Sequence, residues 1–199
     1  MVNKDKNRYR NAANAFRTQR YVVVRGILPA PVVDYLKIYY DILIWNGILR
    51  HDEQCPSSLA IGGDPGFDAL MEWLRPEISR LVGLPLSSTY SYTRCYTKGE
   101  ILQRHTDRPA CEISMTISIA IPPHAKPSTI YLKPPGSKQR KVEMNEGDGC
   151  IYAGIEVEHW RKPFRRDGYI QLFLHFITRD NPNHDQLVFD GRGRLGCSR

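Results

Sequence analysis

The sequence lacks the features of a membrane or secreted protein. It contains no uninterrupted apolar run of about eighteen residues, so we expect no transmembrane helix. Residues 1–20 are polar and basic, without the apolar core of a secretory signal. The five cysteines are widely spaced and form no C-x-x-C pair, which favours reduced thiols over a disulfide framework. These absences predict a cytoplasmic protein, with a mitochondrial-type presequence at residues 1–20 as the alternative.

The positive charge of the chain is spread over several short segments. The formal net charge of +7 is compatible with an anionic partner. The surplus, however, lies at both ends of the chain and in the stretches KQRK and RKPFRR. No zinc-finger spacing, RNP sequence or basic stripe along one predicted helix accompanies it. We therefore expect no nucleic-acid partner.

The character of the sequence changes near residue 90. A strand pattern at residues 21–28 precedes two helical patterns, the second of which is interrupted at Pro76 and ends at Gly83. Seven short strand-like segments separated by Gly/Pro-rich turns follow, which favours an antiparallel jelly roll in one α+β domain over residues 1–199. The predicted parts are a basic, disordered tail (1–20), a strand with helical support (21–89), the β-rich core (90–180) and a turn-rich, loosely packed tail (181–199).

One short motif is typical of a metal site. His105 and Asp107 are separated by one residue, so on a strand both side chains point to the same face. An H-x-D pair alone is usually a surface turn, but His159 lies where a hairpin returns across the sheet. Two histidines and one carboxylate form the facial triad of non-haem iron(II), whereas zinc more often takes three histidines or thiolates. The pattern predicts a metal site at His105, Asp107 and His159 and favours Fe(II).

A longer stretch around this motif resembles a known enzyme family. The matching segments are YTRCYTKGEILQRHTDRPACEISMTISI, which contains the pattern Y-x-x-G-x-x-L-x-x-H-x-D, and EGDGCIYAGIEVEHWRKPF. Together they resemble the iron(II)- and 2-oxoglutarate-dependent oxygenases of the prolyl 4-hydroxylase-like branch, over residues 85–180. The resemblance implies a double-stranded β-helix with the N-terminal helices packed on its major sheet. It also implies that the triad holds Fe(II) and that 2-oxoglutarate binds this metal.

The same resemblance implies the reaction. We expect a dioxygenase that hydroxylates a small molecule or peptide, consumes O2 and 2-oxoglutarate, and releases succinate and CO2. Two alternatives stay open. An AlkB-like nucleic-acid demethylase would need an R-x5-R pattern on the last strand, which residues 165–180 do not supply. A non-catalytic, cupin-like protein would bind metal without turnover.

The far carboxylate of 2-oxoglutarate requires a fixed cation, for which a bidentate arginine beside a hydroxyl is well suited. Many relatives of this branch carry Lys or Arg nine or ten residues after the distal histidine, where this sequence has glycine and tyrosine. By resemblance, Tyr96 supplies the hydroxyl. For the cation we predict Arg161 first and Arg166 second, with Arg94 contacting the cosubstrate or the substrate.

Further residues are expected around the metal. Arg108 either contacts the substrate or forms a structural ion pair with Glu112. Trp160 either contacts the substrate or packs in the core or at the rim of the pocket. We expect His175 to be a core histidine rather than a fourth ligand. The predicted substrate contacts are Tyr92, Arg108, Gln171 and Trp160.

Overall fold

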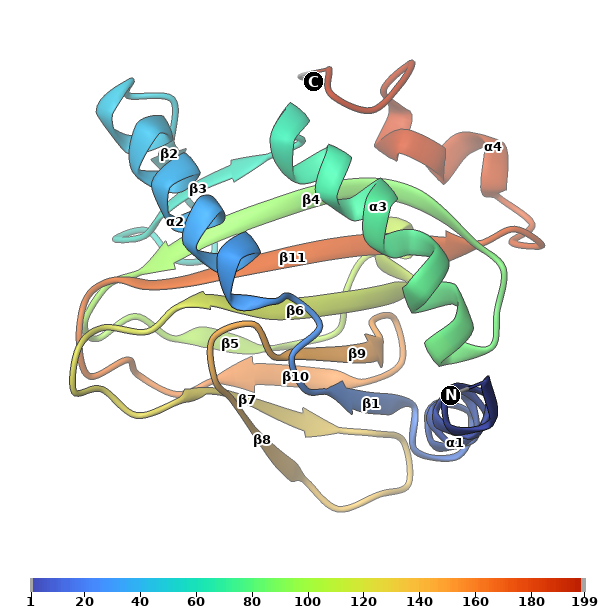
Figure 1. The fold of residues 1–199 in the computed structure, drawn as a ribbon. Helices are drawn as coiled ribbons and strands as arrows, with labels where there is room; N and C mark the ends of the chain where they lie inside the picture. Colours follow the sequence, from blue (N-terminus) through green and yellow to red (C-terminus); the bar gives the residue numbers. More distant parts are fainter. Residues whose placement is uncertain (1, 198–199) are drawn as a thin grey trace.

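Two antiparallel sheets face each other and form a flattened barrel (Figure 1). The computed structural model describes residues 2–197, with the backbone alone for residues 2–5. The major sheet has the strand order β1-β9-β6-β11-β4-β3-β2, and the minor sheet has the order β5-β10-β7-β8. The predicted α+β double-stranded β-helix is confirmed.

The strand-like segments predicted for the core correspond to strands, but β4 begins at Leu86, before the core predicted from residue 90, and two short strands, β2 and β3, were not predicted. The major sheet consists of β1 (Tyr21–Val24), β2 (Arg50–His51), β3 (Leu59–Gly62), β4 (Leu86–Tyr96), β6 (Ile113–Ala120), β9 (Gly149–Ala153) and β11 (Tyr169–Thr178). The minor sheet consists of β5 (Leu102–His105), β7 (Ser128–Lys133), β8 (Arg140–Met144) and β10 (Glu158–Arg161). A short 3-10 turn, η1 (Pro109–Cys111), lies between β5 and β6.

Strand β11 lies at the centre of the major sheet, between β4 and β6, and all ten of its residues are buried. Its side chains alternate between two environments, as the period of a strand requires. Ile170, Leu172 and Leu174 belong to the main core, which includes residues of the helices. Tyr169 and Phe173 belong to a separate cluster with Tyr96 and Leu102 of β4 and β5. One face of β11 is therefore packed core, and the other faces the interior of the barrel.

Helices α2 (Ala30–Trp45) and α3 (Pro65–Val82) cover the outer face of the major sheet (Figure 1). The Asp64 carboxylate caps α3 by accepting from the backbone N–H of Gly66 and Phe67, and Gly83 ends it with a left-handed φ of 72°. The predicted interruption at Pro76 is wrong, because α3 continues through this residue. The apolar face of α3 is buried, and this packing offsets the hydrogen bond lost at the proline.

The expected disordered tail at residues 1–20 is a helix, α1 (Val2–Gln19). Phe16 on this helix is 1 % exposed, and the Tyr9 hydroxyl donates to Glu77 of α3 at 2.8 Å. The sequence prediction was wrong because the basic residues of α1 obscure its narrow apolar face. α1 therefore belongs to the folded domain.

The C-terminal segment is also packed, contrary to the expected loose tail. It contains α4 (His184–Leu187) and a 3-10 turn, η2 (Val188–Gly191). The Arg192 guanidinium is buried and donates to Asp68 of α3 at 2.8 Å and to the carbonyl of Thr89 at 2.9 Å. A buried ion pair between residues so far apart in the chain has no local sequence signal.

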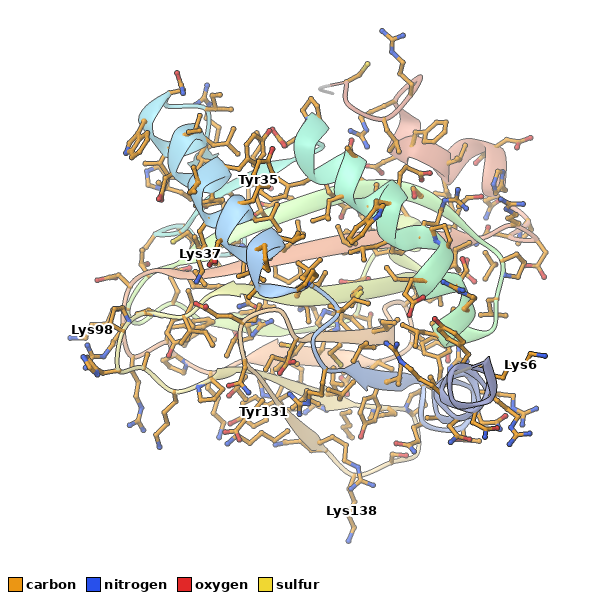
Figure 2. All side chains as sticks on the ribbon, viewed as in Figure 1. Lys6, Tyr35, Lys37, Lys98, Tyr131 and Lys138 are labelled. Carbon is orange, nitrogen blue, oxygen red and sulfur yellow. The ribbon has the colours of Figure 1, made fainter. Side chains whose placement is uncertain are left out.

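The surface carries its positive charge at separate places. Lys6, Lys98 and Lys138 project from three different edges of the molecule (Figure 2). All five cysteines lie in the described part of the chain and are free thiols. No described helix is long and apolar enough to cross a membrane.

Candidate metal centre

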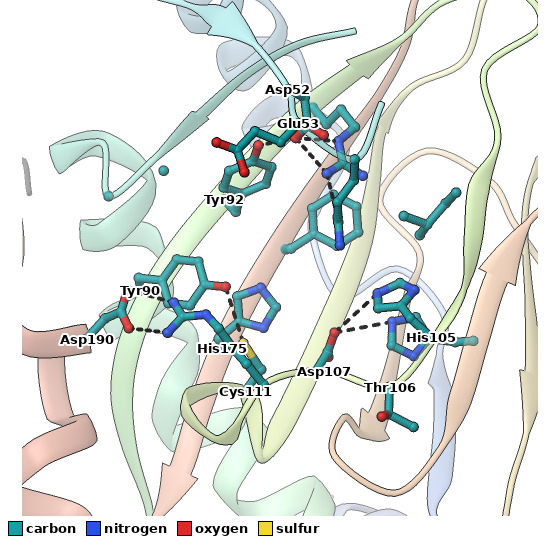
Figure 3. A pocket seen from close by; sticks show the side chains of 18 of the residues that line it. Asp52, Glu53, Tyr90, Tyr92, His105, Thr106, Asp107, Cys111, His175 and Asp190 are labelled. Atoms are coloured by element: carbon teal, nitrogen blue, oxygen red, sulfur yellow. Dashed lines mark hydrogen bonds and ion pairs between the residues drawn. The ribbon is translucent and has the colours of Figure 1, made fainter. Parts of the chain in front are cut away.

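A cavity of about 750 Å3 opens between the two sheets. One wall comes from β4 and from residues 51–54, which comprise the last residue of the short strand β2 and the three residues after it. The opposite wall comes from residues 105–108 at the end of β5, and a third comes from Asp190 and Arg192 of the C-terminal segment. Four segments of the chain thus enclose one space, which Figure 3 shows from close by.

His105, Asp107 and His159 meet in this cavity. His105 is the last residue of β5, and His159 lies directly opposite it on β10. The Nε2 atoms of His105 and His159 lie 3.6 and 3.4 Å from the same oxygen, Oδ1 of Asp107. All three ligand atoms lie within 4.8 Å of one another. The structure therefore brings the three predicted ligands together.

Both histidine rings are held by the backbone in the same way. The Nδ1 of His105 lies 2.8 Å from the carbonyl oxygen of Gln103, and the Nδ1 of His159 lies 2.9 Å from that of Val157. A carbonyl oxygen only accepts, so each Nδ1 carries the proton and each Nε2 presents a lone pair. Such hydrogen bonds to the far nitrogen fix the orientation of metal-ligating histidines.

The electrostatics keep Asp107 ionised. Burial alone would raise the pKa of this carboxyl group, but the contacts of Asp107 with the His105 and His159 imidazoles hold it well below its usual range. For His105, burial acts downward, yet the bonds to Asp107 and Gln103 raise the pKa above its ordinary value. An ionised carboxylate between two imidazoles is a suitable donor set for a divalent cation.

The position of Asp107 differs in one respect from the prediction. We expected both residues of the H-x-D motif on one strand, but β5 ends at His105 and Asp107 lies in the connection to η1. Its backbone N–H donates to the carbonyl of Gly154 at 2.9 Å, which ties this connection to the turn after β9. The two side chains converge through this backbone contact rather than through strand alternation alone.

Arg161 is buried in the interior of the protein and is not among the residues that line the cavity. It follows His159 by two residues on β10, and its side chain is fully buried. Its guanidinium donates only to neutral acceptors, which are Ser128 Oγ at 2.9 Å, the Thr129 carbonyl at 3.0 Å, Thr116 Oγ1 at 3.0 Å and Gln171 Oε1 at 3.1 Å. Its Nε is buried without a hydrogen-bond partner among the described residues. Burial lowers the pKa of this guanidinium from its ordinary value.

Arg94 is also buried, but it has a carboxylate partner. Its Nη2 lies 2.6 Å from Asp52 Oδ2, and the same Asp52 oxygen accepts from the hydroxyl of Tyr92. The Nη1 of Arg94 donates to the Tyr96 hydroxyl at 3.0 Å. Tyr96 therefore lies between the two arginines, with the Arg161 guanidinium carbon 5.7 Å from its ring centre.

The remaining predicted site residues differ in whether they line the cavity. Arg166 is exposed and does not line the cavity, so its predicted contact with a cosubstrate has no support. Trp160 points away from His159, stacks on Tyr131 with ring centroids 5.7 Å apart and does not line the cavity, so its predicted substrate contact has no support. Gln171 is buried against Arg161 instead of facing the cavity. Tyr92 and Arg108 do line the cavity.

Arg108 forms an ion pair, though not with the predicted partner. Its two terminal nitrogens donate to both oxygens of Asp190, at 2.6 and 2.7 Å (Figure 3). Glu112 instead accepts from Thr178 and Asn181. Asp52 and Asp190, which neutralise two arginines of the cavity, were not predicted, because their partners are remote in sequence.

No family model matches the chain, and no curated protein sequence matches it, but solved structures do. A prolyl 4-hydroxylase from Pseudomonas putida superposes with a TM-score of 0.70 at 21 % identity, over 86 % of this chain and 99 % of that one. A prolyl hydroxylase from Trichoplax adhaerens, solved with a peptide of hypoxia inducible factor, gives 0.71 at 16 % identity over 88 % and 91 %. The epimerase SnoN, solved with Fe3+, α-ketoglutarate and nogalamycin RO, gives 0.68 at 13 % identity over 85 % and 83 %.

This chain has the fold of the 2-oxoglutarate- and Fe(II)-dependent oxygenases. The residues of its cavity, together with the buried Arg161 beside Tyr96, fit the groups that such oxygenases hold. Two imidazoles with free Nε2 atoms and one ionised carboxylate oxygen suit Fe(II). A buried arginine with neutral acceptors and an unsatisfied Nε suits an anionic cosubstrate.

Proposed function

We propose that this protein is an Fe(II)- and 2-oxoglutarate-dependent dioxygenase that hydroxylates a small-molecule or peptide substrate. The observation that carries the proposal is the convergence of His105, Asp107 and His159 on one point of the cavity. When bound, the iron and 2-oxoglutarate supply the oxidation by O2, with succinate and CO2 as coproducts.

The residues of the chain would hold and orient these groups. His105 and His159 offer Nε2, because their Nδ1 protons are bound to backbone carbonyls. Asp107 offers a negative charge that needs no deprotonation at neutral pH, since the pKa of its carboxyl group is held low. Metal binding therefore requires no proton release from Asp107, and it requires the neutral form of both histidines.

Arg161 and Tyr96 are our candidates for the far carboxylate of 2-oxoglutarate. Arg161 has no carboxylate partner among the described residues, so a buried positive charge is available to an anion. The Tyr96 hydroxyl accepts from Arg94, which directs its own proton toward another acceptor. Arg161 shares its face of β10 with His159, which it follows by two residues, and its guanidinium carbon lies 5.7 Å from the centre of the Tyr96 ring.

The cavity also constrains the substrate. Each arginine that lines it already faces a carboxylate, in the pairs Arg94–Asp52, Arg108–Asp190 and Arg192–Asp68. These pairs leave little uncompensated positive charge for phosphates or other strongly anionic groups. We therefore favour a neutral or weakly charged substrate and disfavour the nucleic-acid demethylase alternative.

The first test measures cosubstrate binding. Addition of 2-oxoglutarate to the anaerobic Fe(II) protein should produce a metal-to-ligand charge-transfer band, and His105→Ala or Asp107→Ala should abolish it. Absence of this band in wild-type protein would refute the proposal. The non-catalytic alternative would instead give the band without any succinate formation in air.

The second test addresses the reaction type and the substrate. Amino acids, peptides and nucleosides are screened for stimulated succinate release, and products are analysed by mass spectrometry. Hydroxylation adds the mass of one oxygen. A product of unchanged mass and inverted stereochemistry would instead indicate an epimerase, the activity named for SnoN.

A further inference from the structure

The second oxygen of Asp107 has its own partner. Oδ1 faces the two histidines, whereas Oδ2 accepts a hydrogen bond of 2.6 Å from the hydroxyl of Ser114. Ser114 lies on β6 and is fully buried. The two oxygens of one carboxylate are thus in different environments, one toward the candidate metal site and one toward the major sheet.

The proton of Ser114 can serve only one acceptor at a time. Ser114 Oγ lies 2.6 Å from Asp107 Oδ2, 3.3 Å from the carbonyl of Cys111 and 3.0 Å from His175 Nδ1. The carboxylate is charged and closest, so it takes the proton. His175 must then donate from Nδ1 to the serine oxygen, which gives a directed chain from His175 to Ser114 to Asp107.

His175 is itself fixed in place. It lies on β11 directly opposite Ser114 of β6, and its ring packs on that of Tyr90 with centroids 4.5 Å apart. Burial lowers the pKa of His175 to about 4, which is consistent with a neutral ring. His175, which donates the first hydrogen bond of this series, is therefore held by the central strand of the major sheet. It lies away from the connection that carries Asp107.

The space around the Asp107–Ser114 contact is closed by a glycine. A Cβ on Gly154 would lie 2.5 Å from Asp107 Oδ2, 2.7 Å from Ser114 Oγ and 2.2 Å from the Cys111 carbonyl oxygen. The carboxylate consequently has no room to rotate toward the turn after β9. Only a residue without a side chain lets this turn approach so closely.

We propose that Ser114 and His175 are positioning residues that commit Asp107 to bind the metal through Oδ1 alone. A carboxylate bound through both oxygens would use one more position of the metal, and the chain of hydrogen bonds prevents this by occupying Oδ2. This inference rests on the proposed function, because it assumes that the triad binds a divalent metal. It also accounts for the proximity of Asp107, Cys111 and His175, whose nearest polar atoms are already used by Ser114 and by Tyr90.

The test measures metal binding by the metal-free full-length protein, with Co(II) as the probe. Ser114→Ala should weaken Co(II) binding about 10- to 100-fold and alter the visible absorption of the Co(II) form, because Oδ2 is released. His175→Leu should have the same effect, whereas His175→Asn keeps an N–H near the position of Nδ1 and should restore affinity to within a few-fold. Gly154→Ala should also weaken Co(II) binding, since it displaces the same pair of atoms.

Ser91→Ala is the matched control. The Ser91 hydroxyl is equally buried on a strand and donates to the carboxylate of Asp68 at 2.7 Å, outside the triad. This variant should lose similar thermal stability and bind Co(II) like wild type. If folded Ser114→Ala and His175→Leu bind Co(II) with wild-type affinity and spectrum, the positioning role is refuted and the proposed function stands. If wild-type protein binds no Co(II), Mn(II) or Fe(II), the proposed function fails and the positioning role fails with it.

Discussion

Two buried arginines lie on either side of Tyr96, and their surroundings differ in one respect. Arg94 is 4 % exposed and is paired with Asp52 at 2.6 Å. Arg161 is 0 % exposed and meets only hydroxyls, a carbonyl and an amide. One positive charge is therefore compensated by the protein itself, and the other is not compensated by any described carboxylate.

The difference separates a structural arginine from a candidate ligand-binding arginine. Burial of an unpaired charge costs several kcal/mol, so a protein rarely retains one without a reason. An anion that binds Arg161 would remove this cost, and the free energy so gained would contribute to its affinity. An anion that binds Arg94 would gain no such free energy, because the Asp52 carboxylate already compensates the charge of Arg94.

The largest effect is expected from Arg94→Met. This change leaves the buried Asp52 carboxylate without its cation and should lower the free energy of unfolding by about 3–5 kcal/mol. Arg161→Met leaves only neutral groups without a donor and should cost less, at most about 1–3 kcal/mol. Urea denaturation of the two metal-free variants measures the difference, and equal losses would contradict the contrast between the two arginines.

The next effect concerns 2-oxoglutarate. Arg161→Gln should raise the KM for 2-oxoglutarate about 10- to 100-fold, because a charged hydrogen bond contributes about 1.5–3 kcal/mol. The charge-transfer titration should show the same weakening under anaerobic conditions. Arg94→Lys, which keeps the charge beside Asp52, is the matched variant and should change this KM much less. If Arg94→Lys raised this KM more than Arg161→Gln, Arg94 rather than Arg161 would be the arginine that binds 2-oxoglutarate.

A smaller effect is expected from pH. Burial opposes ionisation of Asp52, but Tyr92 and Arg94 hold the pKa of its carboxyl group below the ordinary value. Its contribution to stability is therefore present above the unfolded pKa of about 4 and is lost as the pH falls through the lower folded pKa. Asp52→Asn should flatten the dependence of unfolding free energy on pH in this acidic range. Arg161→Met, which removes no ion pair, should leave the dependence unchanged.

The smallest effect is expected from Arg166→Ala. Arg166 is exposed and lies outside the cavity lining, so its removal should change stability by less than about 0.5 kcal/mol and leave the KM for 2-oxoglutarate within two-fold of wild type. Steady-state succinate formation measures this. A strong rise in the KM for 2-oxoglutarate would instead support Arg166 as a residue that binds the cosubstrate.

Local patterns predicted the β-rich half of the molecule well. Tyr169, Gln171 and Phe173 share the inner face of β11, as strand alternation requires, and the helix ending at Gly83 follows from glycine in a left-handed cap. Prediction failed where packing outweighed local propensity. α1 was missed because its contacts are with α3, and the two-residue strand β2 has too few residues to show a pattern.

The sequence by itself pointed to the candidate metal ligands, because the H-x-D spacing of His105 and Asp107 is a local feature and the stretch around His159, 52 residues after Asp107, carries a recognisable pattern of its own. Only the tertiary structure decided which arginine is compensated and which is not. The deciding contacts join residues far apart in the chain, such as Arg94 with Asp52, 42 residues away, and Ser114 with His175, 61 residues away. Such contacts form when the two sheets and the C-terminal segment close around one cavity, and no pattern within a single segment encodes them.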